Sequence, residues 1–97
     1  MTVTVGLVRI YLALPSESLK EKRTIVKSVV ERLRNRFNAS VAETEDLDIP
    51  SRAVIAAACL SNSSSHAQSQ VQSIADAVAA WRLDVEVLDV QTELIPL

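Results

Sequence analysis

The fold is decided by residues 18–38, SLKEKRTIVKSVVERLRNRFN, whose apolar side chains recur at three- and four-residue steps. At about 100° per residue, this spacing predicts a long amphipathic helix with one narrow buried stripe. Ser18 and Glu21 form a capping box, in which the hydroxyl accepts from the Glu21 N–H and the carboxylate reaches back to the Ser18 N–H. Asn38 is the predicted C-terminal cap. The members of the stripe are Leu19, Val26, Val29, Val30, Leu33 and Phe37.

This helix also carries most of the positive charge of the chain. Residues 19–37 hold seven basic and two acidic residues, a net of +5, whereas the remaining residues hold three basic and ten acidic, a net of −7. Four basic side chains fall within roughly 60° of one another on the helical wheel and form what we call the basic row. Many charged helix faces serve only to keep a protein solvated, and this is the favoured interpretation of the basic row. The alternative is that the row binds an anionic partner such as RNA. The basic row consists of Lys20, Arg23, Lys27 and Arg34.

Three further cations of the helix lie outside the basic row. Lys22 projects near the N-terminal end of the apolar stripe, where we expect its stem to lie on the core and its ammonium to reach water. Arg32 and Arg36 lie on the opposite flank of the helix.

Strand patterns surround a second helical pattern. Residues 2–14 alternate, with Val8, Ile10, Leu12 and Leu14 on one face and Arg9 and Tyr11 on the other. A short strand (39–44), a polar turn (45–51) and a nearly continuous apolar strand (52–60) follow the first helix. Residues 61–65 form a loop, Ser65 and Gln68 offer a second capping box, and residues 83–94 form the last strand. The second helix has the stripe Ala67, Val71, Ile74, Val78 and Trp81.

The order β-α-β-β-α-β predicts a ferredoxin-like α+β sandwich formed by one domain over residues 1–97. Right-handed crossovers place both helices on one face of an antiparallel sheet with strand order 4-1-3-2. Arg9 and Tyr11 then lie on the open sheet face, which is the face without helices. Gly6, the only glycine, marks either a bulge or a close approach of another backbone.

Composition narrows the class of protein. The chain has 97 residues and one cysteine, Cys59, which excludes an internal disulfide. The N-terminus shows no signal-peptide pattern, and the longest apolar run is too short to span a bilayer. We therefore expect a soluble cytoplasmic protein with no membrane partner.

No group of residues predicts catalysis, a metal site or a cofactor. His66 next to Ser63–Ser65 is interpreted as part of a surface capping loop, because no third group can be assigned to orient it as a base. Four acidic residues near the turn could bind a cation, but a solvated hairpin is favoured because no glycine shapes a tight loop. An enzymatic role is not favoured. The four acidic residues are Glu43, Glu45, Asp46 and Asp48.

Several short motifs together resemble the YlxP-like family of uncharacterised bacterial proteins. They are Val5-Gly6-Leu7 with Arg9-Ile10, Ser18-Leu19-Lys20-Glu21-Lys22-Arg23, Arg34-Asn35-Arg36-Phe37-Asn38 with Ser40-Val41-Ala42-Glu43, Arg52-Ala53 and Ser61-Asn62. Members often carry an aromatic residue just before Arg52, where this chain has Pro50. The resemblance implies a ferredoxin-like fold and supplies no catalytic residues. Family members are often encoded beside translation and ribosome-maturation genes, which implies a link to RNA.

Two functional hypotheses follow from these observations. The first is a non-enzymatic module that contacts RNA or a ribosomal particle through the basic row. The alternative is a protein-interaction or homo-oligomeric adaptor in which this helix meets an acidic protein partner. In a homo-oligomer, a second subunit would cover apolar residues of the open sheet face or pair with an edge strand. Stacking of bases on the open sheet face is less favoured, because Tyr11 is the only aromatic residue there.

Overall fold

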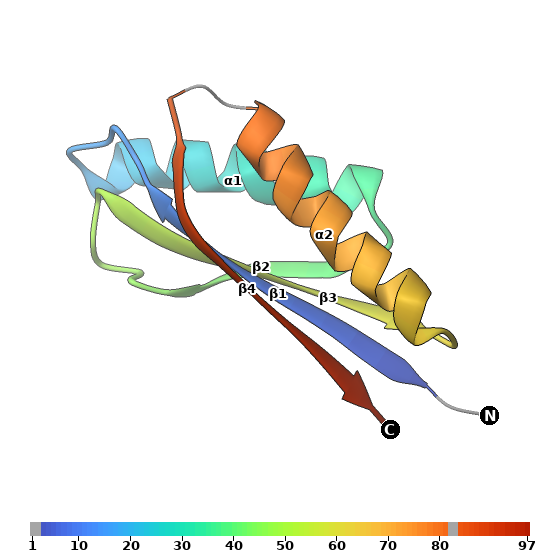
Figure 1. The fold of residues 1–97 in the computed structure, drawn as a ribbon. Coiled ribbons are helices and arrows are strands. Elements are labelled where there is room, and N and C mark those ends of the chain that lie inside the picture. The colour runs from blue at the N-terminus through green and yellow to red at the C-terminus, as the bar shows by residue number, and fades with distance from the viewer. Residues whose placement is uncertain (1–2, 82–83) are drawn as a thin grey trace.

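The computed structural model describes residues 3–81 and 84–97 as a two-layer α+β sandwich (Figure 1). Its six elements follow the predicted order, and α1 and α2 lie on the same side of a single four-stranded sheet. The elements are β1 (Thr4–Ala13), α1 (Leu19–Arg36), β2 (Ser40–Glu45), β3 (Arg52–Ser61), α2 (Ser64–Trp81) and β4 (Glu86–Pro96).

The sheet order is β2-β3-β1-β4, and each neighbouring pair is antiparallel. Read from the other edge this is 4-1-3-2, so the predicted ferredoxin-like topology is confirmed. β2 and β4 are the edge strands. The described ends of the chain lie side by side, because the Leu97 N–H donates to the Val3 carbonyl at 2.8 Å.

The core lies between the helices and one face of the sheet. Val8, Ile10 and Leu12 of β1 are buried and alternate with half-buried residues on the open sheet face, as the period of two predicts. Both helices contribute their stripes: Val26, Val29, Val30 and Leu33 are buried in α1, and Ala67, Val71, Ile74 and Val78 are buried in α2. The predicted stripe residues Leu19, Phe37 and Trp81 are only half-buried.

Gly6 marks a close approach between β1 and α2. A Cβ atom at this position would lie 3.0 Å from Val71 Cγ1 and 3.2 Å from the Ala67 carbonyl oxygen. The β1 bulge occurs between Tyr11 and Leu12 instead, where the register with β4 shifts. The absence of a side chain at Gly6 therefore lets α2 pack directly on the sheet.

The helix caps differ in detail from the prediction. The Glu21 N–H donates to Ser18 Oγ at 3.1 Å as predicted, but the Glu21 carboxylate accepts from the Glu17 N–H and not from Ser18. Phe37, with φ −121°, is the C-cap of α1 in place of Asn38.

The predicted capping box at Ser65 and Gln68 is wrong. Helix α2 begins at Ser64, and Ser63 Oγ accepts from the His66 N–H at 3.3 Å. The Ser63 N–H donates to Ser61 Oγ at the end of β3, so the strand end selects which serine of the run becomes the cap.

The observed strand boundaries also differ from the predicted ones by one to three residues. β2 ends at Glu45 and β3 at Ser61, each one residue later than predicted, and β4 covers residues 86–96. The predicted start of the last strand at Leu83 lies outside the described residues, as does the predicted start of the first strand at Thr2.

We predict that Gly6→Ala lowers the free energy of unfolding by about 1–3 kcal/mol, the usual effect of overpacking a filled core. The added methyl group has to displace the side chain of Val71 or the backbone of α2. Urea denaturation measures the change. In a Val71→Ala background, Gly6→Ala should lower the free energy of unfolding by less, because Val71 Cγ1 is then gone. A Gly6→Ala variant as stable as wild type would contradict the close approach.

Candidate functional site

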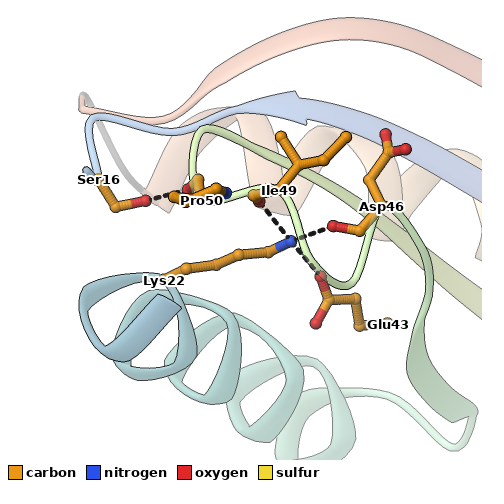
Figure 2. Close-up of polar contacts among 6 residues, drawn as sticks. All are labelled: Ser16, Lys22, Glu43, Asp46, Ile49 and Pro50. Atoms are coloured by element: carbon orange, nitrogen blue, oxygen red, sulfur yellow. Dashed lines mark hydrogen bonds and ion pairs between the residues drawn. The ribbon is translucent and has the colours of Figure 1, made fainter. Parts of the chain in front are cut away.

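The side chain of Lys22 fixes how α1 lies on the sheet. It is only 2% exposed, the largest side chain among the fully buried ones. Its ammonium donates to the carbonyl of Asp46 and, at 2.8 Å, to the carbonyl of Ile49, and it lies 2.9 Å from Glu43 Oε2 (Figure 2). Three oxygen atoms therefore surround the ammonium, and two of them accept its hydrogen bonds. The expectation that this ammonium reaches water was wrong.

Glu43 neutralises Lys22 as an ion pair. Its side chain is 19% exposed, and Oε2 is buried without a well-directed hydrogen bond, so the contact is mainly electrostatic. A charge taken out of water is stable only when it is paired and hydrogen-bonded. The carboxylate supplies the opposite charge and the two carbonyls supply the hydrogen bonds.

The β2–β3 loop is shaped to receive this lysine. Asp46 has φ 58°, the left-handed conformation that turns the chain, and the Ile49 N–H closes the turn on the Asp46 carbonyl at 3.0 Å. Ser16 Oγ donates to the Pro50 carbonyl, and the Leu14 N–H donates to the Ser51 carbonyl. The loop is thereby joined to the connection that precedes α1.

We predict that Lys22→Met destabilises the fold by about 3–5 kcal/mol, as expected when one partner of a buried ion pair is removed. The variant leaves the Glu43 carboxylate and two loop carbonyls without their cation. Urea denaturation followed by circular dichroism measures the loss. The matched control is Lys20→Met, two residues away on the exposed surface, which should change stability by less than about 0.5 kcal/mol. Equal effects of the two variants would contradict the role of Lys22.

With α1 held in this way, three residues of the basic row project into solvent. Lys20, Arg23 and Lys27 are exposed. Lys27 lies 4.0 Å from Glu31 one turn later, and both side chains are largely exposed, so this pair contributes little. Within residues 3–81 and 84–97, no ion pair involves Lys20 or Arg23.

Arg34, the fourth member of the basic row, is held differently. Its Nη2 donates to the Val41 carbonyl of edge strand β2 at 2.7 Å. The guanidinium still carries its charge at an exposed position, but part of its hydrogen-bonding capacity is used within the protein. The row therefore combines three extended cations with one that also attaches α1 to β2.

The structure brings together a second basic group that the sequence did not reveal. On the opposite flank of α1, the guanidinium carbons of Arg32 and Arg36 lie 4.8 Å and 5.6 Å from the centre of the Trp81 ring in α2. Arg36 also lies 5.6 Å from the Phe37 ring. The helical wheel placed both arginines on this flank. Trp81, however, follows Arg36 by 45 residues and Arg32 by 49, and it was interpreted as part of the apolar stripe of the second helix. The available signal in the sequence for this contact was the position of the single tryptophan at the end of a predicted helix.

The open sheet face carries Arg9 and Tyr11 as the strand alternation predicts. Both are half-buried, and Tyr11 Oη donates to Gln91 Oε1 on β4 at 3.2 Å. Arg9 lies between Ala56 of β3 and Gln91. Any role of these two residues in binding stays a prediction.

The structure also places the acidic residues near the turn, His66 and Cys59. Glu43 is committed to Lys22, and the described residues contain no group of three or more metal-ligating side chains. His66 is exposed, and its backbone N–H donates to the capping Ser63 Oγ. Cys59 is buried in β3, and burial raises the pKa of its thiol. No helix among the described residues is long and apolar enough to cross a membrane.

These features define a ferredoxin-like sandwich whose first helix carries a basic flank. Residues 5–92 match the family described as a protein of unknown function (DUF503), and the chain belongs to this YlxP-like family. The match runs from β1 into β4 and includes both helices. Among the curated proteins, none matches this chain.

Proposed function

We propose that this protein is a non-enzymatic RNA-binding module that uses helix α1 as its contact surface. The observation that supports it most directly is the exposed, extended arrangement of Lys20, Arg23 and Lys27 along one flank of α1. Phosphates are bound by cations spaced along a surface, and their binding depends on charge and not on base sequence.

The distribution of charge favours an anionic polymer over a single ion. Lys20 to Lys27 spans about 10 Å of helix axis, enough to reach more than one phosphate. The remainder of the chain is acidic, which directs a polyanion to α1 and away from the other surfaces. A ribosomal particle presents RNA in this form and is the proposed assembly.

We predict that wild type binds a single-stranded RNA oligonucleotide with an affinity that falls steeply with salt. In a Lys20/Arg23/Lys27→Gln variant, the slope of log affinity against log salt should be smaller by about two, since each lost single-strand phosphate contact contributes about 0.7. Fluorescence anisotropy across a salt series measures the slope, and co-sedimentation with ribosomal subunits extends the test. Arg34 is left unchanged because its hydrogen bond to Val41 supports the fold.

The matched control is Asn62→Asp with Gln68→Glu and Ser69→Glu, three exposed positions in and before α2. It changes the net charge by the same three units, so it should bind RNA nearly as wild type does if position matters. Absence of RNA binding by wild type at low salt would contradict the proposal. An acidic protein that binds α1 and is not displaced by RNA would instead support the adaptor.

One observation favours the homo-oligomeric adaptor as a second candidate. The open sheet face has a shallow hollow of about 210 Å³, lined mainly by Leu7 and small side chains such as Ala42, Ala56 and Ala58. Leu60 beside it on β3 is 70% exposed. Small side chains permit a second sheet to approach closely, so a second copy of this face is the occupant that fits.

The adaptor candidate predicts a dimer in sedimentation-velocity experiments at micromolar concentration. Leu60→Glu should then shift the protein to a monomer, because a carboxylate would be buried in the interface. Leu47→Glu, at another exposed leucine in the β2–β3 loop, is the control and should leave the dimer intact. A wild-type protein that remains monomeric at 100-fold higher concentration would rule out this candidate.

A further inference from the structure

The second basic group lies in a groove between the C-terminal ends of α1 and α2. We propose that this groove, formed by Arg32, Arg36 and Trp81, is a subsite for one unpaired nucleotide of a single-stranded RNA. In it the base stacks on the exposed part of the indole and guanidinium groups, and the phosphate is bound by the arginines. The choice of RNA as ligand rests on the proposed function; the site itself is independent of the basic row.

The positive charge of Arg32 and Arg36 is not balanced by an ion pair among the described residues. Both guanidinium groups contact the same indole ring, whose electron-rich face attracts cations but cannot neutralise them. Two positive charges gathered on one ring repel each other, and a bound anion would remove that repulsion.

The surface around Arg36 and Trp81 is hollowed. One hollow of about 300 Å³ is lined by Arg32, Asn35, Arg36 and Trp81. A neighbouring hollow of about 310 Å³ shares Arg36 and Trp81 and reaches α2. Together they form a shallow, open trough along the arginine–tryptophan contact, and the volume of each lies at the lower end of the range of small-ligand sites. The α2 residues that line the second hollow are Ser73, Asp76, Ala77, Ala80 and Trp81.

The two ends of the trough differ in chemistry. At one end, Arg32 offers guanidinium N–H donors and Asn35 offers an amide group. The guanidinium donors match the geometry of phosphate oxygens. The other end holds Asp76, whose carboxylate repels phosphate but accepts hydrogen bonds from base N–H groups; Oδ1 already accepts from Gln72 at 3.0 Å. We therefore place the phosphate at the Arg32 end and the base at the Asp76 end, with the ring of Trp81 between them.

The trough also explains how a single strand could be distinguished from a duplex. The basic row recognises phosphates alone, which every nucleic acid presents. An aromatic ring accessible in a basic groove accepts an unstacked base, which a duplex does not offer. The two surfaces on the two flanks of α1 together select a flexible single strand.

Trp81 is the only tryptophan of the chain, so its intrinsic fluorescence reports on the subsite directly. We expect a ten-nucleotide single-stranded RNA to quench this fluorescence, and a blunt duplex of the same sequence to bind without quenching it. Trp81→Leu should weaken single-strand binding roughly 5- to 150-fold, the range for loss of one stacked base. Trp81→Phe keeps an aromatic ring and should retain most of the affinity, which separates stacking from a packing role.

The outcomes separate this proposal from the preceding one. Quenching that persists in the Lys20/Arg23/Lys27→Gln variant, with the affinity and the salt slope of wild type, would support the subsite and contradict the basic row. Salt-dependent RNA binding by wild type with unchanged Trp81 fluorescence would overturn the subsite and leave the basic row standing. Quenching by adenosine 5′-monophosphate but not by RNA would overturn RNA as the ligand. In a variant with both Arg32→Gln and Arg36→Gln, neither probe should quench the fluorescence.

Discussion

The buried ammonium of Lys22 is the contact on which the arrangement of this protein depends. It joins α1, β2 and the β2–β3 loop at one point, through Glu43 and the carbonyls of Asp46 and Ile49. The contact fixes the rotation of α1 about its axis, because the buried stripe and the lysine must face the sheet together. That rotation directs Lys20, Arg23 and Lys27 to one side of the molecule and Arg32 and Arg36 to the other.

The topology could be predicted because it follows from periodicity. The three- and four-residue spacing of Val26, Val29, Val30 and Leu33, and the alternation of β1, each specify an element and its buried face. Lys22 could not be assigned in this way. The amphipathic pattern shows that Lys22 lies near the core. It does not show that a loop more than twenty residues later turns its carbonyl groups toward the ammonium. The general rule that a lysine ammonium reaches water therefore gave the wrong expectation.

The candidate site was predictable only where it lies within one helix. The spacing of Lys20, Arg23 and Lys27 placed them correctly on one exposed flank, but it could not show that Arg34 donates to β2. The groove required α1 and α2 to be packed against each other before Arg32, Arg36 and Trp81 could meet. Caps within the serine run were similarly decided by where β3 ends and not by local preference.

We propose that both flanks of α1 form the binding surface of this protein. The most direct test is the chemical-shift change of backbone and indole N–H signals when a single-stranded RNA is added to isotope-labelled protein. Our account predicts that the largest changes occur in α1 and at the indole of Trp81. Changes concentrated at Arg9 and Tyr11 on the open sheet face, with α1 unaffected, would contradict it.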